Sequence, residues 1–562
     1  MKQFLKYGGL VMLAVLSTLT VSARTVYINV DDLRGDLTAS LRDACKKVPA
    51  RDTLMITFGR GTYSVNGTIQ CSCHTVIKGQ GRDKTTIILN KGNDKSGFKA
   101  FPDDTFFKFA GKIDSPISLE ISDLTFKLKE HKGIWWEDSR CHAVKVYHAD
   151  GVNIHHVDSY MQNAIITNFD LRVCSNVTVS DCIINNYNNC SEGGNLWLRG
   201  DMHNVHVYRN KFYKYGNDEV IGVFGNIIDA NSAKKGNISY RDLLIEDNEI
   251  TYGYNGRDKD PDLQNHTLMT LHAGENQSKW VVTTNNFRVR NNKFSINDEC
   301  KRCILLKLQD GCRHQGITFE GNKIVNADLH SSKQYYRQDF EISDVTAEQD
   351  TIHLINNSVT NKNSVLNSSK EIGYSFLLIQ GGNVDMNGNK IVSTVTTDPY
   401  TGRATGVQLV YCGAKGGTVL MRNNVCKGVK CISTVGEGSG TKYFKLTATN
   451  NYFEGDTRVY SHKIEQMDLD FSGNTFKSNN MNFFLHEFAN KGSVVFNNND
   501  VTVTQDGGKF MTHWSKTPTN SMKFKKLEVK NNVFRGVKNE NDLFKHMTNV
   551  DKRTIRSNTV KR

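Results

Sequence analysis

The chain has 562 residues and a formal net charge of +13, from 71 Lys and Arg against 58 Asp and Glu. It contains only 6 prolines and no Pro- or Ser-rich run, which argues against several domains joined by linkers. The sequence also lacks a phosphate-binding glycine loop, a serine-hydrolase elbow and any nucleic-acid-binding motif, so nothing in it supports those functions.

Residues 1–23 have the pattern of a secretory signal peptide. Lys2 and Lys6 precede an apolar run over residues 8–20, and the segment 21–23 (Val-Ser-Ala) is a suitable cleavage site. The run is too short to predict a membrane span. We therefore expect a periplasmic or secreted protein. Removing the two lysines from +13 leaves +11, and outside the cytoplasm this charge favours an acidic polysaccharide as the partner rather than nucleic acid.

Residues 24–99 are expected to form an N-terminal cap and the first coils of a repeat. An entry strand is predicted over 25–30, and an amphipathic helix over 36–48 places Leu37, Leu41 and Ala44 on one face. Short strands with glycine corners follow between residues 53 and 81. A helix before the first coil would cover the unpaired strand edge that an open solenoid end exposes.

Residues 100–562 carry a repeated pattern, apolar-x-apolar-x-x-Asn (or Asp)-x-apolar, at intervals of 23 to 44 residues. The alternation predicts short strands. Asn tolerates the left-handed backbone of a tight corner, and stacked Asn side chains can form a hydrogen-bonded ladder. Such a unit cannot bury its own apolar face, so the pattern predicts a solenoid of parallel strands, with 540–562 forming a last coil and a C-terminal cap. The predicted corner residues are Asp123, Asp158, Asp181, Asn210, Asn248, Asn292, Asn322, Asn357, Asn389, Asn424, Asn451, Asn474, Asn499, Asn532 and Asn558.

With this repeat the chain resembles the right-handed parallel β-helices of the pectate-lyase-like superfamily. The resemblance implies an all-β solenoid with an N-terminal capping helix, and we expect a monomer. The superfamily includes polysaccharide lyases, glycoside hydrolases and binding proteins, so the fold alone does not choose among these functions.

The resemblance also implies that the strand after the second corner of each coil lines a substrate groove. If the Leu and Val positions of these strands point inward, alternation turns a set of polar and aromatic side chains outward. The outward set is Lys145, Trp197, Arg199, Thr270, His272, Lys307 and Gln309.

Arg199, His272 and Lys307 are the basis of a lyase hypothesis. β-Elimination on a uronate needs the carboxylate neutralised, a base for the C5 proton and an acid for the leaving oxygen. Arg199 could bind the carboxylate through two parallel hydrogen bonds, and His272 or Lys307 could be the base. Trp197 offers a surface for a sugar ring. Pectin, alginate and glycosaminoglycans are candidate substrates.

Acidic residues near the same strands support two further hypotheses. Asp201 with either Asp218 or Glu219 could supply the paired carboxyl groups of a polygalacturonase-like hydrolase, although the signatures of that family are absent. The same carboxylates could instead hold Ca²⁺. A non-catalytic carbohydrate-binding β-helix is the third hypothesis.

The 13 cysteines leave at least one thiol unpaired. Cys71 with Cys73, and Cys300 and Cys303 with Cys312 and His314, could form disulfides or a metal site. Stacking of cysteines inside the solenoid core is the simpler alternative.

Overall fold

The computed structural model describes most of the chain in segments. Residues 1–22, which hold nearly all of the predicted signal peptide, lie outside the described part, as do Asp218 and Gln309. The described residues are 23–89, 105–128, 140–162, 165–187, 194–215, 219–224, 237–253, 267–273, 281–296, 302–308, 313–326, 335–343, 350–362, 372–394, 406–435, 441–461, 464–479, 482–486, 491–504, 509–512, 524–545 and 550–561.

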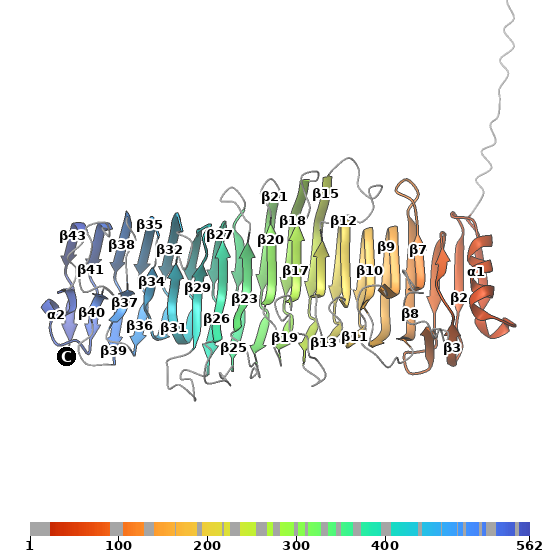
Figure 1. The fold of residues 1–562 in the computed structure, drawn as a ribbon, viewed down its shortest axis with the longest axis horizontal. Coiled ribbons are helices and arrows are strands. Elements are labelled where there is room, and N and C mark those ends of the chain that lie inside the picture. The colour runs from red at the N-terminus through yellow and green to blue at the C-terminus, as the bar shows by residue number, and fades with distance from the viewer. Residues whose placement is uncertain are drawn as a thin grey trace, which may run out of the picture.

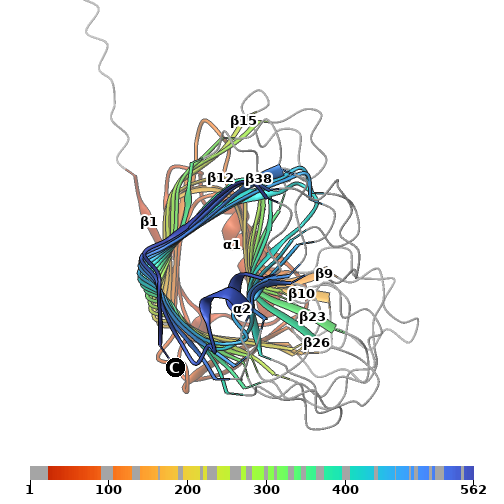
Figure 2. The same ribbon diagram turned by 90° about the vertical axis from the view of Figure 1, so that its left-hand side faces the viewer.

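The chain folds as a right-handed parallel β-helix, which confirms the predicted fold class. Each strand pairs in parallel with a strand of the next coil, and the coils follow one another from the N-terminal to the C-terminal end (Figure 1). Viewed along its axis the helix is a closed loop of strands (Figure 2). Since every coil repeats the same path, residues far apart in sequence lie side by side on adjacent coils.

The strands form three faces, and five long strands bend from one face to another: β8 (Ile117–Leu128), β9 (Arg140–Gln162), β10 (Ile165–Ser180), β12 (Leu196–Tyr208) and β31 (Val425–Val435). The groove face also contains β4 (Ile69–Cys71), β7 (Thr105–Ala110), β14 (Glu219–Phe224), β17 (Thr267–Ala273), β20 (Arg302–Leu308), β23 (Tyr335–Ser343), β26 (Ile372–Gln380), β29 (Val407–Cys412), β34 (Val459–Ser461), β37 (Asn482–His486) and β40 (Lys509–Thr512).

The second face follows the groove face along the chain. It contains β1 (Thr25–Asn29), β2 (Thr53–Thr57), β5 (His74–Lys78), β15 (Asn237–Glu246), β18 (Val281–Arg290), β21 (Arg313–Glu320), β24 (Ile352–Ile355), β27 (Asn383–Asn387), β30 (Gly417–Arg422), β32 (Tyr443–Thr449), β35 (Gln466–Ser472), β38 (Lys491–Asn497), β41 (Phe524–Lys530) and β43 (Val550–Arg556). The third face contains β3 (Gly61–Val65), β6 (Thr85–Leu89), β11 (Ile183–Tyr187), β13 (Lys211–Tyr215), β16 (Glu249–Tyr252), β19 (Lys293–Ile296), β22 (Lys323–Asn326), β25 (Ser358–Asn361), β28 (Lys390–Ser393), β33 (Tyr452–Gly455), β36 (Thr475–Ser478), β39 (Asp500–Val503), β42 (Val533–Arg535) and β44 (Thr559–Lys561).

A buried asparagine ladder joins the second face to the third. Each ladder asparagine accepts hydrogen bonds from the backbone N–H and the side-chain amide of the one before it, as Asn357 does from Asn322 at 3.1 and 3.0 Å. Its own amide donates to a backbone carbonyl, here that of Phe319 at 3.0 Å. The ladder runs through Asn210, Asn248, Asn292, Asn322, Asn357, Asn389, Asn424, Asn451, Asn474, Asn499, Asn532 and Asn558.

Two details of the predicted corners are wrong. The left-handed residue is the one before the ladder asparagine, as in Arg209 (φ 54°) and Asn356 (φ 53°), because the asparagine itself already starts the next strand. In the first coils the ladder position is not an asparagine at all: Cys182 donates its backbone N–H to Asn210, and the preceding coils carry apolar residues there. Asp123 and Asp181 do have the predicted left-handed backbone (φ 60° and 55°), but, like Asp158, they flank the ladder position without occupying it.

Helices lie at the two ends of the solenoid (Figure 1). The predicted N-terminal cap is α1 (Leu37–Lys47), which begins after a short 3-10 turn (Val30–Asp32) and is capped by the Asp36 carboxylate. At the other end α2 (Glu540–Phe544) buries Phe544 against Phe510 and Phe534. Among the described residues, none of the helices has the length and apolar composition needed to span a membrane.

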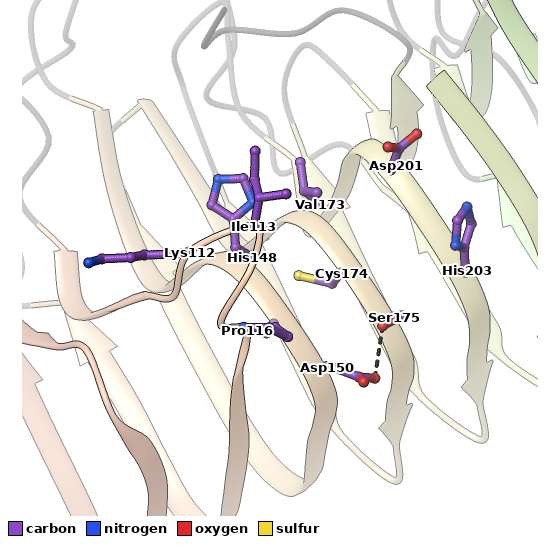
Figure 3. A pocket seen from close by; sticks show the side chains of 11 residues that line it. Lys112, Ile113, Pro116, His148, Asp150, Val173, Cys174, Ser175, Asp201 and His203 are labelled. Carbon is purple, nitrogen blue, oxygen red and sulfur yellow. Dashed lines mark hydrogen bonds between the residues drawn. The ribbon is translucent and has the colours of Figure 1, made fainter. Parts of the chain in front are cut away.

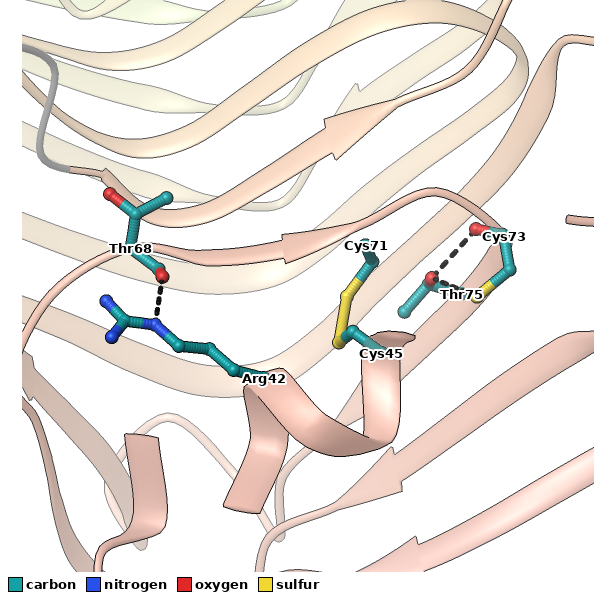
Figure 4. The surroundings of a disulfide bond; sticks show 6 residues. All are labelled: Arg42, Cys45, Thr68, Cys71, Cys73 and Thr75. Atoms are coloured by element: carbon teal, nitrogen blue, oxygen red, sulfur yellow. Dashed lines mark hydrogen bonds between the residues drawn. A yellow bond between two sulfur atoms is a disulfide. The ribbon is translucent and has the colours of Figure 1, made fainter. Parts of the chain in front are cut away.

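Cys45 of α1 forms a disulfide with Cys71 of β4, which ties the cap to the first coil (Figure 4). Beside it, the Arg42 Nε donates to the Thr68 carbonyl at 2.8 Å. The sequence left open whether Cys71 and Cys73 form a disulfide or a metal site. Cys71 is instead bonded to Cys45, and Cys73 is a separate buried thiol. Cys303 is also a buried thiol, while Cys300 and Cys312 lie outside the described residues.

Candidate active-site groove

Two rows of side chains point away from the core along the groove face. Their direction follows from alternation, because the residues between them, such as Leu198, Leu271 and Leu306, are fully buried in the interior. The first row is Lys145, Asp170, Trp197, Gly222, Thr270 and Leu305. The second row is Tyr147, Arg172, Arg199, Phe224, His272 and Lys307.

The predicted placement of Arg199, His272 and Lys307 on one face is confirmed. They share the second row, with Phe224 between Arg199 and His272. Adjacent strands are about 4.8 Å apart, so the backbones of Arg199 and His272 are separated by roughly 10 Å. The arginine and the histidine are each only 8 % exposed, less than the sequence suggested, because side chains of adjacent coils pack against one another.

Asp170 is the charged centre of the N-terminal half of the rows. It is fully buried and accepts from the Arg172 Nη2 at 2.6 Å, while the Arg199 Nε lies 3.6 Å from its other oxygen. Burial on its own would raise the pKa of this carboxyl group, but Arg199, Arg172 and His142 together hold it well below its usual range. Asp170 is therefore an anion that orients the two guanidinium groups.

His142 lies beside this centre, with its Nε2 4.0 Å from Asp170 and its Nδ1 3.1 Å from the Thr167 carbonyl oxygen. Burial lowers the pKa of His142 to about 3, and this effect outweighs the attraction of Asp170. The ring is consequently neutral at physiological pH, so Nδ1 can donate to the carbonyl.

An aromatic surface follows the charged centre. The Trp197 and Phe224 rings meet edge to face at 5.6 Å, and the Arg199 guanidinium lies 3.8 Å from the Trp197 ring centroid. Two glycines make room for these rings. A Cβ atom at Gly194 would lie 2.3 Å from the Trp197 Nε1, and one at Gly222 would lie 2.2 Å from the Phe224 ring. The indole, predicted as a surface for a sugar, is thus fixed in position by its neighbours.

Cations also surround Tyr147 at the N-terminal end of the second row. Arg172, Lys108 and Lys145 lie 5.1, 5.6 and 5.7 Å from its ring centroid. The Lys145 side chain, predicted to bind substrate, is only 3 % exposed. This part of the groove face is therefore strongly basic, with Asp170 as its carboxylate among the described residues of the two rows.

Of the predicted acidic pairings, the one between Asp201 and Glu219 lies within the described residues, and it is not formed on this face. Glu219 lies at the start of β14, where its Oε1 accepts from the Thr270 hydroxyl at 3.2 Å. Asp201 lies beyond the corner at Gly200 (φ 70°), where it accepts from the Ser239 N–H at 2.7 Å on the second face. The corner thus separates Asp201 from Glu219, and Asp218 lies outside the described residues.

Sequence reasoning missed Asp170, Arg172, His142 and Tyr147. The alternation that selected Lys145 also reaches Tyr147 on β9, and it runs through β10 to Asp170 and Arg172, so following it along both strands would have found three of the four. His142 could not be found in this way, because its role depends on its contact with Asp170.

No cluster of three or more His, Cys, Asp or Glu side chains suited to a metal ion occurs among the described residues. The carboxylates considered for Ca²⁺ are accordingly dispersed there: Asp201 and Glu219 lie on opposite sides of a corner.

No protein-family model matches the chain, and comparison with curated sequences finds no match. Among solved structures, the chain is similar to an exopolygalacturonase from Thermotoga maritima (12 % identity over 76 % of this chain and 92 % of that one, TM-score 0.44). It is also similar to the Agl-KA catalytic domain (12 % identity, 71 % of this chain, TM-score 0.43), of which it spans only 65 %. A mannuronic-acid-specific family 6 polysaccharide lyase from human gut microbiota is similar at 10 % identity over 80 % of this chain and 87 % of that one, with a TM-score of 0.33. These likenesses concern the β-helix path and carry no functional conclusion.

Proposed function

We propose that the protein is a polysaccharide lyase that cleaves an acidic, uronate-containing polysaccharide by β-elimination. The observation that carries the proposal is the second row itself, in which Arg172, Arg199, His272 and Lys307 follow the helix axis beside the Trp197 ring. A polymer lying on this row would pass one basic side chain after another, as a chain with repeated carboxylates requires.

The proposed roles follow from position. Arg199, held between Asp170 and Trp197, would bind the uronate carboxylate and stabilise the charge that develops when the C5 proton leaves. His272 or Lys307 would remove that proton. The electron pair then forms the C4–C5 double bond as the C4–O bond breaks, and the leaving oxygen takes up a proton. Lys145 and Thr270 of the first row, predicted to bind substrate, are 3 % and 0 % exposed, so their role is to support the row rather than to contact the sugar.

Elimination is favoured over hydrolysis by the state of the carboxyl groups. A hydrolase needs one carboxyl group kept protonated opposite a second one. Asp170 is held in its ionised form by two arginines, and Asp201 lies on another face. The other described carboxylates on this face include Glu219, which accepts from Thr270, and Glu341, which continues the first row beyond Leu305 and is ion-paired with Arg302.

The decisive experiment incubates residues 24–562 with hyaluronan, chondroitin sulfate, heparin, polygalacturonate and alginate, with and without Ca²⁺. Ultraviolet absorbance of the unsaturated product and release of reducing ends are followed together. We expect both to rise for at least one substrate. Reducing ends without the absorbance would indicate a hydrolase, and binding without either signal would indicate a binding protein.

Variants then assign the base. Loss of a general base typically costs about 10²- to 10⁴-fold in rate, so we expect such a fall in kcat for either His272→Ala or Lys307→Met. His353→Ala is the matched control, because His353 is a partly exposed histidine on the second face. Equal activity of wild type and both groove variants would contradict the proposed roles.

We further propose that the protein acts in the periplasm or outside the cell. The support is the leader-like pattern of residues 1–23 together with the Cys45–Cys71 disulfide, since disulfides persist mainly in oxidising compartments. Amino-terminal sequencing of the exported protein should begin at residue 24, and an uncleaved cytoplasmic protein would contradict the assignment.

A further inference from the structure

A pocket of about 300 Å³ lies beside the groove rows, at the corner between the groove face and the second face (Figure 3). It is lined by the segments 112–116, 148–150, 173–175 and 201–203, from the turn between β7 and β8 and from three successive coils. Its volume is at the lower end of the range of about 300–1,000 Å³ for ligand sites, which suits one sugar ring rather than an oligosaccharide.

The pocket directly adjoins the N-terminal half of the second row. His148 follows Tyr147 along β9, and Val173 follows Arg172 along β10. On β12 the next coil contributes Asp201, two residues beyond Arg199. One or two residues of extended chain span only about 3–7 Å. The pocket therefore opens at the side of the rows.

This sideways position decides what the pocket can hold. The second row follows the helix axis across stacked strands, so a main chain bound to it runs along that axis. The pocket lies on the path of the strands, at right angles to that direction. A group that reaches it must branch from the main chain.

The lining is polar and mixed in charge. Asp150 accepts from the Ser175 hydroxyl at 2.8 Å (Figure 3). It also accepts from the Asn176 amide at 2.6 Å, so its position is fixed. Lys112 contributes a cation, and Ile113 and Pro116 contribute an apolar wall. A sugar ring has hydroxyl groups that suit the polar part of this lining and an apolar face that suits the Ile113–Pro116 wall.

His203 provides the independent sign of a missing partner. Its Nε2 is inaccessible to solvent and makes no hydrogen bond within the described residues. Burial and the nearby Arg241 lower the pKa of His203, which favours the neutral ring. A buried ring nitrogen without a partner is costly, and a ligand hydroxyl group could satisfy it as donor or acceptor.

We propose that this pocket binds a single sugar ring that branches from the main chain of the polysaccharide in the groove. The inference rests on the proposed function, because the polysaccharide main chain in the groove is the proposed substrate. It implies that the preferred substrate is a branched acidic polysaccharide, with the branch on the sugar that contacts Tyr147, Arg172 or Arg199.

The test compares a branched acidic polysaccharide with the same polymer after removal of its branches. Ile113→Trp fills the pocket and His203→Ala removes its polar nitrogen, and His206→Ala, on the same strand but outside the pocket, is the matched control. We expect both pocket variants to lower kcat/KM for the branched polymer by about tenfold or more, the scale of a lost contact group, and to leave the linear polymer unchanged. Equal losses on both polymers, or no loss on either, would overturn the proposal.

Direct binding separates this inference from the proposed function. Saturation-transfer NMR of the mature chain with methyl glycosides of neutral and acidic sugars should show weak binding of at least one, lost in Ile113→Trp and kept in His206→Ala. This readout needs no catalysis, so it stands even if no substrate is cleaved. Absence of binding by every glycoside, or binding that survives Ile113→Trp, would refute the pocket as a sugar site.

Discussion

Val173 occupies a backbone conformation that β-branched residues rarely adopt. Its φ is 54°, and the equivalent corner residues of the neighbouring coils are His148 (φ 51°) and Gly200 (φ 70°). The left-handed region costs an L-residue roughly 1–2 kcal/mol, whereas asparagine tolerates it better. The corner is therefore set by the path of the coil, and Val173 is tolerated there at a cost in stability.

We expect Val173→Asn to raise the apparent Tm in a thermal unfolding scan, by an amount equivalent to about 1 kcal/mol at most. Val281→Asn is the control, since Val281 is an exposed valine in an ordinary strand of the second face. A lower Tm for Val173→Asn than for the control would show that packing of the valine outweighs its backbone strain.

His142 should make the protein sensitive to acid. Its pKa is lowered from 6.5 to about 3 by burial, so between these values the unfolded chain binds a proton that the folded chain does not. Stability from this group is complete above about pH 6.5 and falls at about 1.4 kcal/mol per pH unit as the pH drops toward 3. His314, whose pKa burial lowers to about 4, acts in the same direction.

The check is the free energy of unfolding measured from pH 8 to pH 4 for wild type and His142→Asn. As the pH falls, the free energy of unfolding of the variant should decrease less steeply than that of the wild type, because asparagine does not titrate. The difference in slope should approach about 1.4 kcal/mol per pH unit, the value for one proton. The difference in free energy of unfolding between the two proteins at pH 8 reports the effect of packing alone and serves as the reference. Parallel curves for the two proteins would contradict a neutral, buried His142.

At the scale of the element, the strands were predictable because each one alternates apolar and polar residues and because an asparagine recurs at the same corner in most coils. The second row was predictable in part for the same reason. What the sequence could not supply is the register between coils of unequal length: Arg199 and Phe224 are neighbours across 25 residues, but Phe224 and His272 across 48. The Asp170–Arg199 contact and the separation of Asp201 from Glu219 depend on register and on the corner at Gly200, so both were missed.

The asparagine ladder is the element that joins the coils, and its interior should be far less tolerant than its end. Asn357→Leu removes the acceptor of the Asn322 backbone N–H and side-chain amide in a fully buried position. Each buried group left without a partner costs about 1–3 kcal/mol, so we expect a loss of roughly 2–5 kcal/mol in denaturant unfolding.

Asn558→Leu is the matched variant at the C-terminal end of the ladder. It removes the same two acceptor contacts, to Asn532 at 3.1 and 2.9 Å, but in a half-exposed position where water can replace them. The loss should therefore be clearly smaller than for Asn357→Leu. Equal losses at the two positions would mean that burial is not what gives the ladder its strength.

At the scale of the whole molecule, the ends of a solenoid need protection, because an end strand lacks a neighbour on one side. Within the described part of the chain β1 pairs only with β2, and α1 lies at this end, joined to the first coil by the Cys45–Cys71 disulfide. An unprotected strand edge is a template for association with another chain. The disulfide closes a loop of 26 residues, for which a chain-entropy estimate gives about 3–4 kcal/mol.

Cys45→Ser should accordingly loosen the N-terminal cap before the rest of the solenoid unfolds. We expect faster amide hydrogen exchange over 37–71, little change in the central coils, and increased light scattering on mild heating as the β1 edge becomes accessible. Cys73→Ser is the control, because it alters a buried thiol two residues from Cys71 without removing a cross-link. A reductant should make the wild type behave like Cys45→Ser and should not affect that variant further. If reduction leaves exchange over 37–47 unchanged, packing of α1 on the first coil holds the cap without the cross-link, and the edge is protected by the helix alone.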